Sequence, residues 1–123
     1  MEFVAGDAVT CAWPGEQDVV LMSWILSALR EPDVGIVLER AWHSLRPGGL
    51  LVLHDFMLDD PGPGPALAAL WFLQYLAYQS DSASFSAADL RARLRRTDFL
   101  TTTTEDLIPG ITKVVLARKA APR

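Results

Sequence analysis

The chain has 123 residues, half of them hydrophobic, and a formal net charge of -4. This length suits one domain with a sizeable core, and the acidic balance argues against a nucleic-acid partner, because phosphate binding needs a concentrated basic surface. The single cysteine, Cys11, cannot form an internal disulfide, and no secretory signal pattern opens the chain, so we expect a cytoplasmic protein. The longest apolar run, residues 65–78, is shorter than the roughly 20 residues that a membrane span requires, so we expect no membrane partner.

The first half of the chain has the pattern of a strand, a helix and a second strand. Residues 18–26 are almost all apolar, which predicts a strand buried on both faces of a parallel sheet. After a break at Pro32, apolar residues recur at helical spacing from Asp33, a candidate N-cap, to Leu45, and a Pro-Gly-Gly sequence would end this helix. Residues 50–53 form a second apolar strand, and this order predicts a βαβ unit.

Two more helices are predicted in the second half. A loop rich in proline and glycine, which interrupt regular secondary structure, spans residues 59–65 and leads into an apolar helix over residues 65–78. Ser86 and Asp89 have the spacing of a capping box, which predicts a short helix whose arginines face solvent. Asp98 stands where this helix should end, and aspartate tolerates the left-handed conformation of such a cap.

A closing antiparallel hairpin completes the prediction. Its strands are residues 99–104 and 111–117, and residues 118–123 would form a frayed tail. The fold class is therefore α/β, although the first strand has few partners within the chain. A mean hydropathy of +0.20 is high for so small a chain and indicates either a dense core or apolar surface meant for another segment or subunit.

Several of these segments resemble the carboxyl-terminal half of a class I S-adenosylmethionine-dependent methyltransferase, most closely the bacterial and plant small-molecule O-methyltransferases. The motifs that carry the resemblance are Gly6-Asp7, the apolar strand at 18–26, Leu45-Arg46-Pro47-Gly48-Gly49 and Leu51-Val52-Leu53-His54-Asp55. The resemblance implies a partial Rossmann-like sheet, equivalent to the family's last four strands, in one domain over residues 1–123. The family's Gly-rich donor loop and ribose-binding acidic residue are absent. We therefore expect the chain to be an incomplete enzyme, weakly active or inactive alone.

The resemblance also places catalytic and cofactor-binding residues. Asp7 matches an aspartate that contacts the adenine of S-adenosyl-L-methionine, although an aspartate that only makes a turn explains it equally well; Ser23 is the second candidate donor contact. The family's catalytic histidine is replaced by Ser27, whose hydroxyl cannot take a phenol proton near neutral pH as an imidazole can. Asp55 matches an acidic residue that orients this histidine.

His54 could act as a substitute base, but a packed or hydrogen-bonded histidine is the alternative interpretation. Neighbours on a strand point to opposite faces, so His54 and Asp55 cannot both face one pocket unless the strand has already ended. A metal site built from these two residues with Asp59 and Asp60 is not expected, because acidic residues in such a loop more often only solvate it.

The acceptor pocket implied by the resemblance would be lined by Trp24, Met57, Phe72 and Tyr75. The spacing of Phe72 and Tyr75 suits ordinary core packing equally well.

Two functions of different classes follow. In the first, the chain is part of an O-methyltransferase that transfers a methyl group from S-adenosyl-L-methionine to a small-molecule acceptor. The second is a non-catalytic interaction module that forms a homo-oligomer or docks onto a chain supplying the missing strands. An unrelated enzyme using His54 and Asp55 has little support, because no nucleophile with a paired base and no glycine-rich phosphate loop is evident.

Overall fold

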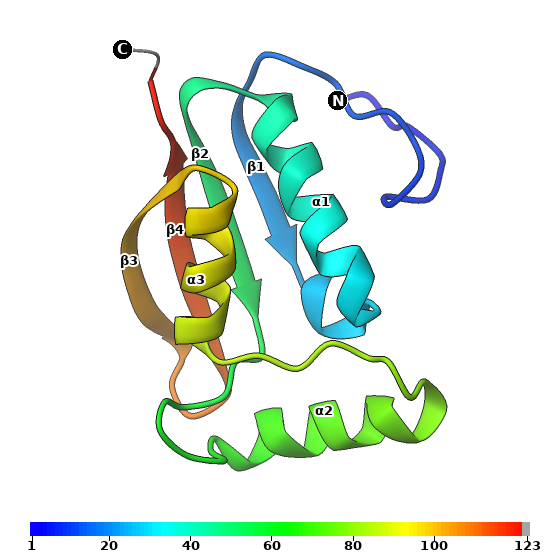
Figure 1. Ribbon diagram of the computed structural model, residues 1–123, viewed down its shortest axis with the longest axis vertical. Helices are drawn as coiled ribbons and strands as arrows, with labels where there is room; N and C mark the ends of the chain where they lie inside the picture. Colours follow the sequence, from blue (N-terminus) through cyan, green and yellow to red (C-terminus); the bar gives the residue numbers. More distant parts are fainter. Residues whose placement is uncertain (122–123) are drawn as a thin grey trace.

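The computed structural model describes residues 1–121, apart from the side chains of Thr101 and Thr102. Strands and helices are arranged around one sheet (Figure 1). In chain order the elements are β1 (Gln17–Ser23), the 3₁₀ turn η1 (Leu26–Ala28), α1 (Glu31–Ser44), β2 (Leu45–Asp55), α2 (Ala66–Tyr78), α3 (Ala87–Arg96), β3 (Phe99–Ile108) and β4 (Thr112–Lys119).

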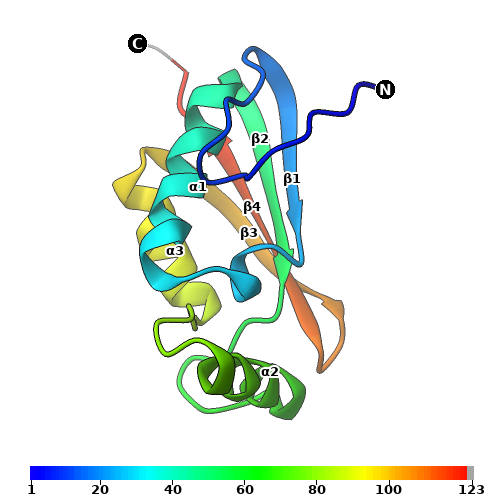
Figure 2. The same cartoon turned by 90° about the vertical axis from the view of Figure 1, so that its right-hand side faces the viewer.

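The sheet has four strands in the order β1-β2-β4-β3. β1 and β2 run parallel, whereas β4 is antiparallel to both β2 and β3. Helices α1 and α3 pack on one face of the sheet, and α2 crosses beyond its end (Figures 1 and 2). The α/β class, the parallel pair bridged by a helix and the terminal hairpin are therefore confirmed.

The core lies between the sheet and the two helices α1 and α3. Leu51 and Leu53 of β2 are fully buried there, together with Val37 of α1 and Leu90 of α3. Alternate residues of a strand point to opposite faces, so the neighbours of these leucines in β2 belong to the other face. The hydrophobic effect of this one-sided layer is what holds the sheet and helices together.

The opposite face of the sheet, which we call the open face, carries no helix among residues 1–121 (Figure 2). Val19 and Leu21 of β1 are 53% and 65% exposed on it. The prediction that the first strand is buried on both faces is therefore wrong. The prediction fails because α1 and α3 cover one face of the sheet and no helix within residues 1–121 covers the other. Strand register assigns the following apolar residues to the open face: Val19, Leu21, Leu50, Val52, Leu100, Val114 and Leu116.

β1 is shorter than predicted. It ends at Ser23 rather than at residue 26, because Trp24 has a left-handed conformation with φ of 60°. This backbone reversal turns the chain out of the sheet and into η1.

α1 begins earlier than predicted, at Glu31, with Arg30 rather than Asp33 as its N-cap. Pro32 lies in the first turn, where a missing N–H is not needed, so it starts the helix instead of breaking the chain before it. β2 begins directly after α1 at Leu45. Gln17 of β1 pairs with Leu45 and Val19 pairs with Leu50, so the Pro-Gly-Gly segment lies in an irregularity of the strand register.

The second half of the chain follows its prediction closely. α2 starts one residue after Pro65, and α3 has the expected capping box, in which the Asp89 N–H donates to Ser86 Oγ at 3.1 Å. Asp98 has φ of 60°, as expected for the cap that ends α3. The two helices therefore have the ends that their sequence signals indicate.

The hairpin strands are longer than predicted. β3 continues four residues beyond Thr104, because an edge strand accommodates charged side chains such as Glu105 and Asp106. β4 runs to Lys119, so residues 118 and 119 are strand and not tail, while residues 122–123 lie outside the described part of the chain. None of the helices within residues 1–121 combines the length and hydropathy needed to cross a bilayer.

Two leucines on adjacent strands test the one-sided core. We expect Leu53→Ala, at a fully buried position, to lower the free energy of unfolding by about 2–5 kcal/mol, because it leaves a cavity. Leu21→Ala, at a position 65% exposed, should change it by about 0.5 kcal/mol or less. Urea titration followed by circular dichroism measures both. Equal losses in the two variants would show that the open face is covered in solution.

Candidate functional site

Candidate site residues gather where the parallel strands β1 and β2 end. Ser23 is paired with His54 in the last register position of the two strands, and the Trp24 N–H donates to the His54 carbonyl at 3.0 Å. Asp55 ends β2, and η1 brings Ser27 back over it. The carboxyl ends of parallel strands are the usual location of ligand sites in α/β sheets.

Asp55 holds the turn that contains Ser27. Its Oδ2 accepts the Ser27 backbone N–H at 3.0 Å, and its Oδ1 accepts the Phe56 N–H at 2.8 Å. Burial raises the pKa of the Asp55 carboxyl above its ordinary value, and the hydrogen bonds from Ser27 and Phe56 oppose this shift. The Ser27 hydroxyl is itself buried and completes no hydrogen bond of good geometry. The sequence predicts that Ser27 and Asp55 lie close together, and in the structure a hydrogen bond from the Ser27 backbone to the Asp55 carboxylate joins them.

His54 lies on the open face, on the other side of β2 from Asp55. Its Nδ1 is 2.7 Å from Ser23 Oγ, and its Nε2 is 3.0 Å from Thr112 Oγ1 on β4. Both ring nitrogens are therefore engaged with hydroxyl groups. The strand register places His54 and Asp55 on opposite faces of β2, as expected for neighbours in a strand. Their catalytic roles stay a prediction.

A row of aromatic rings leads from His54 to α2. Trp24 packs edge-on against His54 and against Phe56, with ring centroids 5.0 and 4.7 Å apart. Phe56 contacts Trp71 at 4.9 Å, and Trp71 contacts Tyr75 at 5.1 Å. The Trp71 indole N–H is buried and has no hydrogen-bond partner. Two of the four predicted acceptor residues, Trp24 and Tyr75, thus belong to one run of contacting aromatic rings, in which Phe56 is buried.

The other two predicted acceptor residues belong to the hydrophobic core. Met57 is fully buried, and Phe72 is 3% exposed and packs against Phe85 with ring centroids 5.3 Å apart. Their role in binding an acceptor stays a prediction.

Asp7 makes a turn in the arm that precedes β1. Its Oδ1 accepts the Val9 N–H at 2.8 Å, and its carbonyl accepts the Cys11 N–H at 2.8 Å. The arm is fastened to α1 by hydrogen bonds from Arg40 to the Cys11 carbonyl and from Ser44 to the Pro14 carbonyl. Asp7 therefore stabilises a turn within the arm, residues 1–16. Its contact with a methyl donor stays a prediction.

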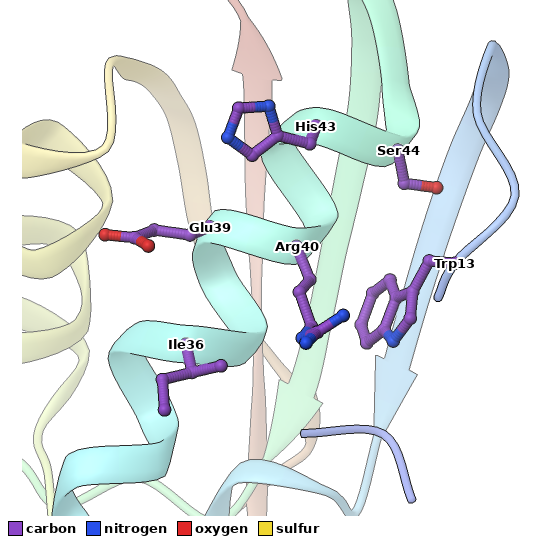
Figure 3. A pocket seen from close by; sticks show the side chains of 6 residues that line it. All are labelled: Trp13, Ile36, Glu39, Arg40, His43 and Ser44. Carbon is purple, nitrogen blue, oxygen red and sulfur yellow. The ribbon is translucent and has the colours of Figure 1, made fainter. Parts of the chain in front are cut away.

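A cavity of about 360 Å³ lies where the arm meets α1 (Figure 3). Arg40 and Trp13 point toward each other across it, and the exposed His43 lies one helical turn beyond Glu39. It is lined by Trp13, Ile36, Glu39, Arg40, His43 and Ser44, none of which is a candidate site residue from the sequence.

Asp59, in the loop after β2, forms an ion pair with Lys113. Lys113 Nζ lies 3.5 Å from Asp59 and 2.8 Å from Asp106, which ties the loop after β2 to the hairpin. Within residues 1–121 no group of three His, Cys, Asp or Glu side chains is close enough to hold a metal ion.

Sequence reasoning missed two residues of this site, Thr112 and Phe56. Thr112 becomes a neighbour of His54 only through the antiparallel pairing of β2 with β4, a contact between residues far apart in the chain. Phe56 follows Asp55 directly, and its aromatic side chain beside a candidate site residue was a signal that could have been used.

Comparison with solved structures shows a fold shared with O-methyltransferases. A candidate O-methyltransferase from Nostoc punctiforme superimposes with a TM-score of 0.85 at 21% identity, covering 94% of this chain and 36% of its own. Mitomycin 7-O-methyltransferase MmcR gives 0.80 at 24% identity, covering 97% of this chain and 34% of its own. Human N-acetylserotonin methyltransferase in complex with SAM gives 0.79 at 25% identity, covering 98% and 34%.

The chain thus has the fold of part of an O-methyltransferase, and it spans about a third of the length of the structures it matches. This confirms the resemblance at the level of the fold. No family model and no curated protein sequence matches the chain.

The raised pKa of Asp55 predicts a pH dependence of stability. Between the ordinary value of 3.8 and the higher value in the folded state, the folded chain binds more protons at Asp55 than the unfolded chain does. The contribution of Asp55 to the free energy of unfolding should therefore fall as the pH rises through this window. We expect the free energy of unfolding of the natural chain, minus that of Asp55→Asn, to fall in the same way.

Urea titrations at a series of pH values measure this difference. Asp60→Asn is the matched control, because it removes the same charge from an exposed loop position. A difference that rises with pH for Asp55→Asn would contradict the burial of its carboxyl.

Proposed function

We propose that this chain is the carboxyl-terminal part of an S-adenosylmethionine-dependent O-methyltransferase that acts on a small-molecule acceptor. The observation that carries the proposal is the superposition of nearly the whole chain on O-methyltransferase structures, with TM-scores up to 0.85. The single cysteine fits a reducing, cytoplasmic compartment.

The geometry of β1 supports a donor site beside Ser23. In open α/β sheets, ligands bind at the carboxyl ends of the strands, where the strand order reverses. A further parallel strand on the outer side of β1 would create such a point, and Ser23 ends β1 there. His54 fixes the position of the Ser23 hydroxyl, so His54 serves as a positioning residue in this proposal.

The residues of this chain do not complete a donor site. S-adenosyl-L-methionine supplies an electrophilic methyl group when bound, but the sequence has no Gly-rich loop to hold it. Asp7 already uses its carboxylate within its own turn, and Ser23 shares its hydroxyl with His54. We therefore propose that another polypeptide segment provides most donor contacts.

The acceptor side of the proposed site has an unusual base position. Ser27 stands where the resemblance places a histidine, and its hydroxyl is too weak a base to take a phenol proton near neutral pH. Asp55 engages both of its oxygens with backbone N–H groups and so orients the turn around Ser27. Placing the acceptor oxygen in line with the methyl group would then supply most of the acceleration. The exposed ring of Trp24, supported by its contact with Phe56, would offer the acceptor an aromatic wall.

A second candidate function is that of a non-catalytic interaction module, either a homo-oligomer or a chain that docks onto a partner. It is favoured by the exposure of Val19 and Leu21 on β1, whose outer edge pairs with no other strand in the described residues 1–121. An apolar strand at an open edge tends to pair with another chain.

Donor binding tests the catalytic proposal. We expect isothermal titration calorimetry at micromolar protein to show no binding of S-adenosyl-L-methionine by the 123-residue chain, because its sequence has no Gly-rich donor loop. A chimera in which this chain replaces the matching third of human N-acetylserotonin methyltransferase should bind it. In the chimera, Ser23→Ala should weaken binding by about tenfold, consistent with the loss of one hydrogen bond to a charged ligand.

Ser84→Ala in the chimera is the matched control, because Ser84 is an exposed serine remote in sequence from the strand ends. Micromolar donor binding by the chain alone would contradict the incomplete site. A folded chimera without donor binding would contradict the proposed function.

A further inference from the structure

The cavity of about 360 Å³ between the arm and α1, which we call the arm cavity, contains no candidate residue of the methyltransferase site (Figure 3). Two segments of the chain form its walls: Trp13 belongs to the arm, whereas Ile36, Arg40 and Ser44 belong to α1. Small-molecule sites usually occupy cavities of about 300–1,000 Å³. A small ligand bound here would therefore contact the arm and the helix together.

Arg40 brings an unpaired positive charge to the arm cavity. Within residues 1–121 no carboxylate lies within ion-pair distance of its guanidinium. Glu39, its neighbour in the chain, also lines the cavity, but its side chain points away from Trp13 (Figure 3), since consecutive residues of a helix do not face each other. The half-buried guanidinium therefore offers an anion a charge that no side chain of the described part neutralises.

One hydrogen bond fixes the orientation of this guanidinium. Arg40 Nη1 donates to the Cys11 carbonyl at 2.5 Å, whereas Nε is buried and has no acceptor within residues 1–121. Because the group is planar and its N–H directions are fixed, the edge made by Nε and Nη2 stays unused. The two parallel N–H groups of such an edge match the two oxygens of a carboxylate. A carboxylate on this edge would give the buried Nε the acceptor that it lacks.

Trp13 supplies an aromatic surface opposite the charge. Its indole N–H donates to the Ala8 carbonyl at 3.0 Å, which restrains the ring within the arm. The ring and the Arg40 guanidinium point toward each other across the cavity (Figure 3). Ile36, an exposed apolar residue of α1, adds a second apolar wall. These side chains favour a ligand that carries a flat ring beside its charge.

The two kinds of wall together select a class of ligand. Inorganic phosphate could meet the guanidinium, but it would gain nothing from Trp13 or Ile36. An uncharged aromatic compound could pack on Trp13, but it would leave the buried Nε of Arg40 without a strong acceptor. An aromatic carboxylate uses both walls at once.

We propose that the arm cavity binds a small aromatic carboxylate, whose two oxygens accept hydrogen bonds from Nε and Nη2 of Arg40 and whose ring packs on Trp13. Such a ligand bridges the arm and α1, and it adds to the hydrogen bonds that Arg40 and Ser44 already make with the arm. The arm cavity shares no residue with the proposed donor and acceptor sites at the strand ends. The inference therefore does not rest on the proposed function.

The test is a titration of the 123-residue chain with 1-naphthoate, followed by calorimetry and by the indole N–H signals in ¹H–¹⁵N NMR spectra. The chain has four tryptophans, and Trp13→Leu identifies the signal of Trp13 by removing it. We expect the Trp13 signal to move during the titration and that of Trp24 to stay in place. Naphthalene-1-carboxamide, which has the same rings without the charge, and inorganic phosphate should each bind at least about tenfold more weakly.

Arg40→Lys should weaken the binding of 1-naphthoate by about tenfold or more, because lysine keeps the charge but not the planar pair of donors. Arg46→Lys is the matched control, since Arg46 lies outside the cavity and its side chain is 59% exposed beside Asp18. It should leave the affinity within about twofold, as expected at a surface position. Trp13→Leu should weaken binding by about fivefold, because it removes the aromatic surface.

A second variant separates the carboxylate contact from the attachment of the arm, because Arg40→Lys also removes the hydrogen bond to the Cys11 carbonyl. Ser44→Ala removes the other bond to the arm, from Ser44 Oγ to the Pro14 carbonyl, and leaves Arg40 unchanged. It should reduce the affinity for 1-naphthoate by no more than about threefold. A loss equal to that of Arg40→Lys would overturn the carboxylate contact.

The remaining outcomes each decide one part of the proposal. Absence of binding at about 5 mM 1-naphthoate would overturn it entirely. Equal affinities for 1-naphthoate and its carboxamide would overturn recognition of the carboxylate, and an equal affinity for phosphate would overturn the role of Trp13. Movement of the Trp24 signal without that of Trp13 would assign the ligand to the candidate methyltransferase site and overturn the arm cavity as its location.

Discussion

One-sided burial of the sheet is the constraint on which the rest of this structure depends. Leu51 and Leu53 of β2 face α1 and α3, while Leu50 and Val52 of the same strand face no helix within the described chain. The same division separates Asp55, buried beneath the turn of Ser27, from His54, held between Ser23 and Thr112. Strand alternation thus assigns each candidate site residue to one of two different environments.

Much of the fold could be predicted from local signals. The capping box at Ser86, the left-handed Asp98 and the apolar run of α2 have short-range causes, and the structure confirms all three. The start of α1 could also have been placed correctly, because proline is favoured in a first helical turn. The left-handed Trp24 has no such signal, since a bulky residue rarely adopts that conformation.

The coverage of β1 could not be read from its sequence. A continuous apolar run is typical of a strand that two layers cover, but the run does not say whether its own chain provides both layers. Val19 and Leu21 are exposed because no helix within residues 1–121 packs on the open face. In the candidate site, too, only some of the contacts could be predicted. The contact of Ser27 with Asp55 follows from one local turn, whereas the contact of His54 with Thr112 depends on pairing between distant strands.

The contrast between the two edges of the sheet has a consequence for the solubility of this chain. β1 carries Asp18 near its start, but residues 19–24 contain no charged side chain, whereas β3 carries Glu105 and Asp106 at the opposite edge. Exposed apolar edge strands without charged gatekeeper residues are where aggregation tends to begin. Expressed on its own, this chain would therefore aggregate first through β1.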